Sequence, residues 1–254
     1  MAWFESALTI NKQQIRIGHF SDSHLFADDS GEYFGVNTAA NLQQTLAAMA
    51  QEHCDVVIFG GDLTQDHTTE SYQAFARLVT NSELHCPVLW VPGNHDDIAL
   101  LEQISTGKIF PHKRITAPFG EILLVNSKGE TPAGWCERAH LDALKRHITQ
   151  QTIVFTHHHP KSIDGYLDKH MLENGPELLN TLVDTKQVIG LFHGHVHHEY
   201  QQKFRTLPIY ATPATSIQFV KHTKEWQQCD LGPAYRLITF NNNGINTEVK
   251  WLDR

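Results

Sequence analysis

The sequence has 254 residues, of which 41% are hydrophobic and 19% are charged. This length and apolar content allow one large domain with a sizeable core, and they exclude a disordered or collagen-like chain. Acidic residues outnumber basic ones by 28 to 20, for a formal net charge of −8. A general nucleic-acid binder or a protein that docks on anionic membranes is therefore disfavoured, and we predict neither kind of partner.

Neither a membrane span nor a secretory leader is indicated by the sequence. No stretch approaches the ~18 consecutive apolar residues that a span needs, and the N-terminal segment lacks a basic region followed by an apolar one. The four cysteines form no C-x-x-C pair, which argues against a thiolate zinc site and a disulfide framework. We expect a cytoplasmic protein with a single domain over residues 1–254.

Strands and helices alternate along the N-terminal part of the chain. Alternating or continuous apolar runs predict strands, and runs with one apolar face predict helices. In chain order, the expected elements are a strand at 14–20, a helix at 39–50, a strand at 56–59, a helix at 70–79, a strand at 88–91 and a helix at 97–104. This alternation favours a parallel sheet with crossover helices.

The second half repeats the alternation and then changes to strands alone. The expected elements are a strand at 122–125, a helix at 137–147, a strand at 152–155, a helix at 175–182 and a strand at 188–192. Consecutive strands then follow at 200–204, 208–211, 217–220, 235–240 and 245–251. The Asn-rich turn at 241–244 joins the last two as a hairpin. We expect this C-terminal quarter to be antiparallel and to close a second sheet.

Five of the predicted strands end in loops that carry carboxylate, amide or imidazole groups. These loops contain Asp22 and His24, Asp62, Asn94 and His95, His157 to His159, and His195 and His197. Any one pair is unremarkable in a chain with 18 histidines, and an Asp or Asn suits an ordinary turn or helix cap. Ligands of α/β sheets bind beyond the carboxyl ends of strands, so five such loops together predict a metal site.

The ordered series D-x-H, G-D, G-N-H-D, H-H and G-H-x-H resembles that of the calcineurin-like metallophosphoesterases. Further segments, including SDSHLF, GDLTQD, PGNHD and GHVHHE, are similar to the bacterial class III 3′,5′-cyclic AMP phosphodiesterases. The resemblance implies an α/β fold, a four-layer α/β/β/α sandwich of two mixed sheets, with a two-metal centre at the strand ends. It also implies hydrolysis of 3′,5′-cyclic AMP to 5′-AMP by attack of a metal-bound hydroxide.

The resemblance implies two divalent or mixed-valence transition-metal ions per chain. One would be held by Asp22, His24, Asp62 and His197. The other would be held by Asp62, Asn94, His157 and His195, so that Asp62 bridges. His159 remains an alternative to His157, because both face the same side of an extended chain. Imidazole and carboxylate ligands without thiolate suit Fe, Mn or Zn rather than Ca.

A small-molecule cyclic nucleotide is the partner that the same resemblance implies. The residues expected to contact it are His24, Asp62, Asn94, His95, His157 and His197. The implied role of His95 is catalytic, either protonating the leaving 3′ oxygen or stabilising charge on phosphorus. Two interpretations of Asp96 stay open: it orients the His95 imidazole, or it caps the helix expected at 97–104.

The sequence leaves the roles of two further residues and several alternative functions open. Asp168 and His170 lie in a segment, LDKHMLEN, that either contacts the nucleotide or forms a surface loop, and the surface loop is the preferred interpretation. The alternative functions are a broader phosphodiesterase or phosphomonoesterase, and a metal-bound binding module without turnover. The P-loop, G-x-G-x-x-G, G-x-S-x-G and H-E-x-x-H motifs are absent, which disfavours the activities they support.

Overall fold

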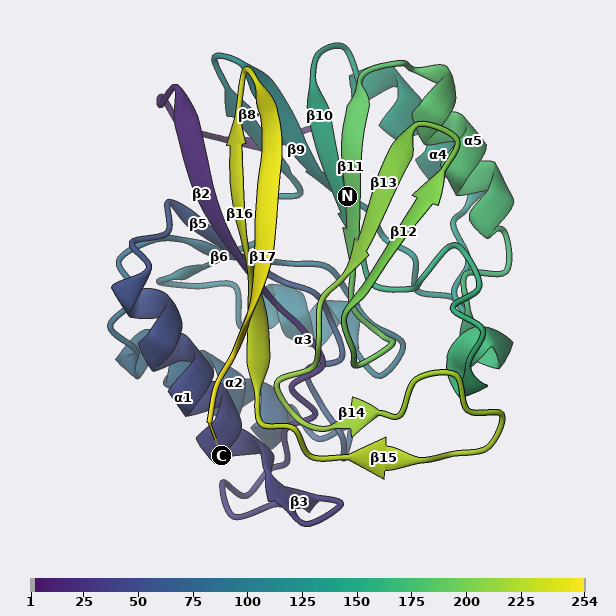
Figure 1. Ribbon diagram of the computed structural model, residues 1–254. Helices are drawn as coiled ribbons and strands as arrows, with labels where there is room; N and C mark the ends of the chain where they lie inside the picture. Colours follow the sequence, from purple (N-terminus) through teal and green to yellow (C-terminus); the bar gives the residue numbers. More distant parts are fainter. Residues whose placement is uncertain (1–2, 254) are drawn as a thin grey trace.

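The computed structural model describes residues 3–253, which form two large mixed β-sheets (Figure 1). Across the seven-stranded sheet, the strands are β1 (Ala7–Thr9), β8 (Arg114–Ala117), β9 (Gly120–Leu124), β10 (Thr152–Thr156), β11 (Val188–His193), β13 (Leu207–Ala211) and β12 (Tyr200–Phe204). Across the six-stranded sheet, they are β17 (Gly244–Trp251), β16 (Ala234–Asn241), β2 (Gln14–Phe20), β5 (Val56–Phe59), β6 (Val88–Trp90) and β7 (Ile109–Phe110). No helix within residues 3–253 is both long and apolar enough to cross a bilayer.

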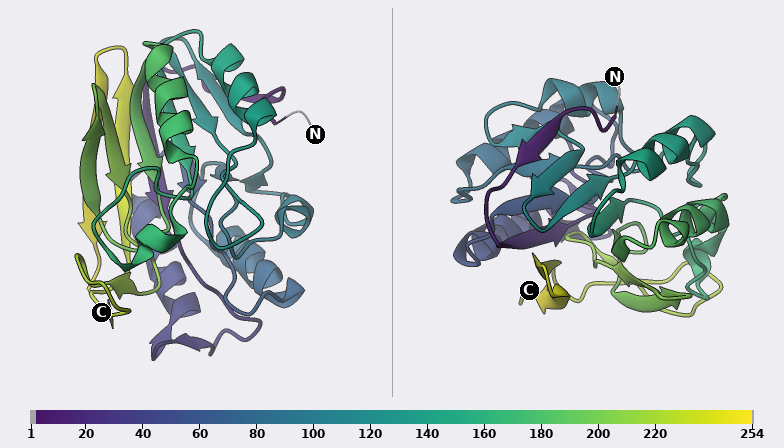
Figure 2. Two further views of the ribbon diagram at one scale, coloured as in Figure 1. Left: turned by 90° about the vertical axis from the view of Figure 1, so that its right-hand side faces the viewer. Right: turned by 90° about the horizontal axis from the view of Figure 1, so that it is seen from above.

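Helices cover the outer face of each sheet, which gives the predicted four layers (Figures 1 and 2). The six-stranded sheet is covered by α1 (Thr38–Gln51), α2 (Thr69–Asn81) and α3 (Ile98–Gln103), and the seven-stranded sheet by α4 (Arg138–His147) and α5 (Gly175–Asp184). Smaller elements are the β3 (Glu32–Tyr33) and β4 (Val36–Asn37) hairpin, the 3₁₀ helix at Tyr166–His170, and the pair β14 (Gln218–Phe219) and β15 (Gln228–Cys229).

Three apolar clusters fill the three interfaces between these layers. On β5, Val57 and Phe59 pack against α1 and α2, whereas Val56 and Ile58 pack between the sheets. Both faces of the strand are therefore buried, as is typical of parallel strands covered by helices. The predicted parallel order is confirmed, because β2, β5, β6 and β7 pair in parallel, and so do β9, β10 and β11.

The C-terminal strands form antiparallel pairs, as predicted, but the expectation that they close a second sheet is wrong, because they divide between the two sheets. β12 and β13 form a hairpin whose second strand pairs in parallel with β11. β16 and β17 form the predicted hairpin, which pairs antiparallel with β2. The outer faces of these strands pack in different cores: Ile209 belongs to the core beneath α4 and α5, and Leu237 belongs to the core beneath α1 and α2. The strand expected at 217–220 is reduced to the two residues of β14.

Candidate metal centre

The loops that follow β2, β5, β6, β10 and β11 meet at one end of the seam between the two sheets. Backbone hydrogen bonds join them directly: Asp22 N donates to Gly61 O at 2.9 Å, and Gly194 N donates to His157 O at 3.2 Å. The first bond lies within the six-stranded half and the second within the seven-stranded half. The His195 N–H crosses between the halves and donates to Asp22 Oδ2 at 3.0 Å.

Five of the seven predicted metal ligands have left-handed backbone conformations. Their φ angles are 57° at Asp22, 46° at His24, 56° at Asp62, 65° at His195 and 55° at His197. Side chains disfavour this region, and holding a residue there costs about 1–3 kcal/mol unless the surroundings impose it. Strained residues of this kind gather at functional sites, so their concentration in these loops marks the seam as the candidate site.

Two glycines allow the loops to approach this closely. A Cβ atom on Gly93 would lie 2.1 Å from Asp62 Oδ1, and one on Gly194 would lie 2.0 Å from Ser21 Oγ. Both distances are far inside van der Waals contact, and the neighbouring atoms are buried. The G-N-H-D and G-H-x-H motifs thus require glycine because Gly93 packs against the loop after β5 and Gly194 packs against the end of β2 in the other sheet.

Asp22, His24 and His197 form one cluster of metal-binding atoms. The two histidine Nε2 atoms are 3.1 Å apart, and Nε2 of His197 is 3.5 Å from Asp22 Oδ1. Nδ1 of His197 donates to the Ile217 carbonyl at 2.8 Å, so in a neutral ring Nε2 carries the lone pair. An acceptor nitrogen therefore faces a carboxylate oxygen in a fully buried position.

A second cluster surrounds His157. Its Nδ1 donates to the Gly60 carbonyl at 2.7 Å, so the lone pair of a neutral ring again lies on Nε2. That atom is 3.2 Å from Asn94 Oδ1, 3.1 Å from His195 Nδ1 and 3.4 Å from Asp62 Oδ2. Asp62 Oδ2 also lies 3.8 Å from His24 Nε2. This oxygen is therefore placed between the two clusters.

The two clusters have the donor chemistry of a binuclear transition-metal site. Lone pairs converge at both when the rings are neutral, and such contacts between acceptors are repulsive unless a proton or a metal cation lies among them. Nδ1 of His24 and Nε2 of His195 are also buried with no hydrogen-bond partner within residues 3–253. Imidazole nitrogen, carboxylate oxygen and amide oxygen are ligands that Zn, Mn and Fe accept. The residues present thus fit the metals that the sequence predicts.

The titration of the buried groups shows the same demand for positive charge. Burial raises the pKa of Asp22 to about 7. Burial would also raise the pKa of Asp62, but nearby histidines, His157 first among them, hold it well below its usual range. Burial lowers the pKa of His157, but the charge of Asp62 outweighs this and raises it to about 9. The field of the two carboxylates therefore favours a cation at this point.

Of the three consecutive histidines, only His157 approaches the Asp62 carboxylate and Asn94 together. His159 turns away, and its Nε2 lies 3.3 Å from Asp168 Oδ1. His158 lies near His157 and His195, but its Nδ1 is 2.9 Å from Ser127 Oγ and its Nε2 donates to the Pro132 carbonyl. The alternation of side chains along an extended chain does not continue through this loop, so we keep His157, rather than His159, as the predicted ligand.

Neither interpretation of Asp96 is correct. The side chain that caps α3 is Asp97, whose Oδ1 accepts from Ala99 N at 2.7 Å. Asp96 is buried and accepts three backbone N–H groups, from Asp62 at 2.9 Å, Leu63 at 2.7 Å and Gly93 at 2.8 Å. It therefore fastens the loop that carries Asp62 to the loop that carries Asn94.

Replacing Asp96 by Asn should destabilise these loops. The amide offers one acceptor oxygen instead of two and turns its NH₂ group toward at least one backbone N–H. Leaving a buried donor unsatisfied costs about 1–3 kcal/mol, and we expect the free energy of unfolding to fall by this amount. Chemical denaturation measures it. Asp97→Asn is the control, because Asn caps a helix about as well as Asp. Equal losses in both variants would contradict the assigned role.

His95 lies beside both clusters and is held from three sides. Its backbone N–H donates to Asp62 Oδ1 at 2.9 Å. Its ring stacks on His67, with centroids 5.2 Å apart and an interplanar angle of 5°, and meets His24 edge-on at 4.9 Å. Nδ1 of the ring has no hydrogen-bond partner in the part of the chain that the structure describes. The stacking partner His67 was not identified from the sequence, because it belongs to none of the five motifs.

A cavity of about 220 Å³ opens over the two clusters. Its floor is formed by six residues predicted for the site: His24, Asp62, Asn94, His95, His195 and His197. Its walls are Tyr33, Pro132, Tyr166, Leu167, His170, Phe219 and Trp226. His170 therefore lines the cavity, and it lies in the 3₁₀ helix Tyr166–His170 rather than in an irregular loop. Asp168 lies behind this wall, where it accepts the N–H groups of Ile163 at 2.8 Å and Gly165 at 3.1 Å.

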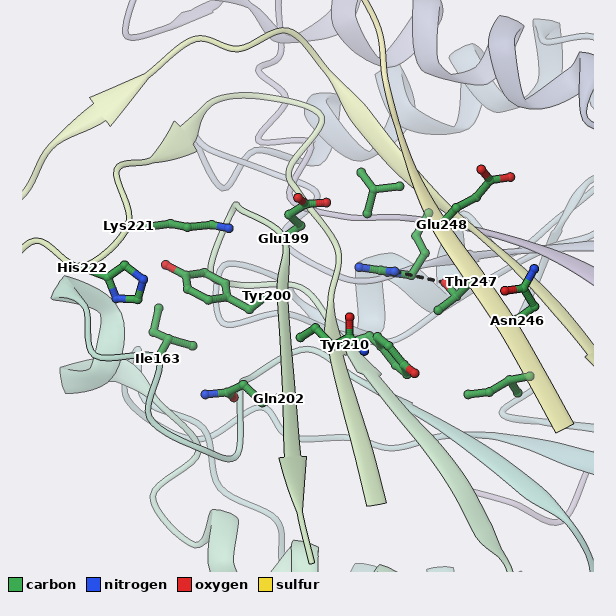
Figure 3. Close-up of a pocket in the computed structure, with 14 residues that line it drawn as sticks. Ile163, Glu199, Tyr200, Gln202, Tyr210, Lys221, His222, Asn246, Thr247 and Glu248 are labelled. Carbon is green, nitrogen blue, oxygen red and sulfur yellow. Dashed lines mark hydrogen bonds between the residues drawn. The ribbon is translucent and has the colours of Figure 1, made fainter. Parts of the chain in front are cut away.

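A larger cavity lies elsewhere, between the edge strands β12 and β17, and measures about 760 Å³ (Figure 3). Tyr200, Lys221 and His222 line one side of it, and Thr247 and Glu248 line the other. None of the four groups of possible metal ligands within residues 3–253 contributes to this cavity. Size therefore does not identify the reactive site, and the chemically competent groups lie beneath the smaller cavity.

Comparison with known proteins agrees with this geometry. The family model of the calcineurin-like phosphoesterases matches residues 15–199. The chain is 53% identical, over the full length of both, to a probable cyclic nucleotide phosphodiesterase of Pseudoalteromonas sp.. It is 32% identical to the 3′,5′-cyclic adenosine monophosphate phosphodiesterase of Escherichia coli K12, with 98% of this chain and 94% of the relative covered.

Solved structures show the same fold at much lower sequence identity. A dimetal phosphatase from Danio rerio matches 92% of this chain and 98% of its own, with a TM-score of 0.65 and 14% identity. A purple acid phosphatase from yellow lupin matches 94% of this chain and 51% of its own, with a TM-score of 0.66 and 13% identity. The two-sheet architecture is therefore shared with both.

Proposed function

The chain belongs to the calcineurin-like phosphoesterase family, and we propose that it hydrolyses 3′,5′-cyclic AMP to 5′-AMP with two metal ions. It is a phosphodiesterase, and the relatives that match its whole length carry cyclic nucleotide or cyclic AMP in their names. One observation supports the two-metal part above all others: two clusters of converging lone pairs share the single oxygen Asp62 Oδ2.

Each cluster supplies the ligands of one ion in this proposal. Asp22, His24 and His197 hold the first, and Asn94, His157 and His195 hold the second. Asp62 completes both sets. Only the two aspartates carry formal negative charge, so the loaded centre stays positive and attracts a phosphodiester anion despite the chain's net charge of −8.

Two divalent ions, when bound, lower the pKa of water to give the nucleophile and neutralise charge on the phosphoryl oxygens. The side chains of the protein itself position the reacting groups. Asp96 fixes the two loops that carry Asp62 and Asn94. The stacked His67 holds His95 at the cavity floor, where its imidazole can give a proton to the leaving 3′ oxygen.

A substrate panel tests the proposed function. We expect protein purified without chelator to contain two transition-metal ions per chain by elemental analysis. With Mn or Fe added, we expect it to hydrolyse cyclic AMP faster than cyclic GMP, 2′,3′-cyclic nucleotides, aryl phosphodiesters or phosphomonoesters. Prolonged chelation should abolish turnover, and metal should restore it.

The same panel separates the alternatives. Comparable rates on all diesters would favour a broader phosphodiesterase, and faster turnover of monoesters would favour a phosphomonoesterase. Two tightly bound metals with no turnover of any ester would favour a binding module. A well-loaded protein with one ion per chain would contradict the two-metal proposal.

A further inference from the structure

Exposed apolar side chains gather in two segments near the mouth of the catalytic cavity. Phe34, at the tip of the β3–β4 hairpin, is 53% exposed, and Trp226, in the segment between β14 and β15, is 37% exposed. Figure 1 shows both segments at the same end of the molecule. Their rings meet with centroids 5.4 Å apart, although the two residues are far apart in sequence. Exposed aromatic rings that converge on a cavity indicate a binding surface.

A continuous series of ring contacts leads from the candidate metal ligands to this surface. Phe219 packs on His197 at a centroid distance of 4.5 Å, and Trp226 meets Phe219 edge-on at 4.6 Å. Tyr166 meets Trp226 edge-on at 5.5 Å from another side. All three aromatic residues line the 220 Å³ cavity. The cavity thus changes from polar candidate ligands at its floor to aromatic rings at its wall.

From this arrangement we infer that Trp226, with Phe219 and Tyr166, forms the subsite for the nucleobase of the substrate. The inference rests on the proposed function, because it takes the phosphodiester to lie on the floor. A base is flat, uncharged and joined to the phosphate through a single ribose, so it reaches the wall when the phosphate reaches the floor. Stacking of a base on an aromatic ring is favourable for every base, and Trp offers the largest ring.

Phe34 is a positioning residue in this subsite. It does not line the cavity but packs on the outer side of Trp226. Its backbone is left-handed, with φ of 51°, and Gly35 follows with φ of 81°. The ring at this tight turn packs against two neighbours, Tyr33 of its own hairpin at a centroid distance of 4.8 Å and Trp226 at 5.4 Å. Loss of the Phe34 ring should therefore loosen Trp226 without removing any contact to the substrate.

The experiment compares cyclic AMP with a base-free analogue, the methyl riboside 3′,5′-cyclic phosphate. With Trp226→Ala, we expect kcat/KM for cyclic AMP to fall by roughly 10-fold to 100-fold, mainly through KM, because the variant loses base stacking. The value for the base-free analogue should change by less than about twofold, since that substrate has no base to stack. Trp226→Phe should recover most of the loss, and Phe34→Ala should give a smaller loss in KM. Trp251→Ala is the control, because Trp251 is also 36% exposed but does not line this cavity.

Other outcomes overturn the inference. Equal losses on both substrates would mean that Trp226 supports the fold or the centre, and no loss on either would place the base elsewhere. If the metal-loaded wild type hydrolyses no diester, the proposed function fails. The nucleobase subsite can then still be tested by measuring ligand binding. Calorimetry should show 5′-AMP binding more tightly than ribose 5-phosphate, and Trp226→Ala should remove that difference. A preserved difference would overturn the subsite.

Discussion

Asp62→Ala is expected to reduce activity to background and to lower the metal content at both positions. The carboxylate is 2% exposed, and its Oδ2 atom faces one histidine of each cluster, His24 and His157. Its removal leaves the two cationic positions close together with half of the centre's negative charge gone, and repulsion in a buried site is weakly screened. Elemental analysis of the purified variant, alongside cyclic AMP turnover, measures both effects.

Two companion variants make this prediction specific. Asp62→Asn keeps the shape and one oxygen but not the charge, so it should retain more metal than Asp62→Ala while remaining nearly inactive. Asp142→Ala removes an exposed carboxylate paired with Arg138 and should change neither quantity. Two metals per chain and near-full turnover in Asp62→Ala would refute the bridging role.

His95→Ala is expected to keep both metals and to lose turnover of cyclic AMP by about 10²–10⁴-fold, the usual contribution of a general acid. The leaving group is a ribose hydroxyl, which departs poorly without a proton. An activated aryl diester needs no such help, so the same variant should lose much less on that substrate. Steady-state kinetics on both substrates, with metal content measured on the same preparation, give the comparison.

Three other outcomes of the His95→Ala experiment would change the role assigned to this residue. Equal losses on both substrates would favour stabilisation of charge on phosphorus over proton donation. Loss of one metal would make His95 a ligand, since its ring lies in a group with His24 and Asp62. Unchanged turnover would remove it from the mechanism. His85→Ala serves as the control, because His85 is exposed and belongs neither to these groups nor to the lining of the cavity, so activity should be kept.

The strands of the two central sheets could be predicted because their apolar patterns are local. In the segment QIRIGHF, alternation places Ile15 and Ile17 on one face, and both pack between the sheets. The partner of a strand is not a local property. Nothing in the residues of β13 or β16 distinguishes the sheet that each joins, and packing against distant elements decides it.

The candidate site could likewise be predicted only in part from the sequence. The seven predicted metal ligands follow strand ends within recognisable motifs, so their convergence could be anticipated. Asp96 could not be assigned, because its partners Asp62 and Leu63 lie more than 30 residues away in the sequence and are backbone groups. The aromatic wall also escaped prediction: Trp226 and Tyr166 belong to irregular or short segments, and no spacing pattern connects them.

The position of the proposed centre on the seam between the sheets would make metal binding a property of the whole fold. Asp22, Asp62 and Asn94 come from the six-stranded half, and His157, His195 and His197 come from the other. A cation bound by both groups would connect the two sheets. Its binding free energy adds to the unfolding free energy, by about 2.7 kcal/mol at a hundred times the dissociation constant. By thermodynamic linkage, any change that weakens the packing between the sheets also weakens the hold on the metal.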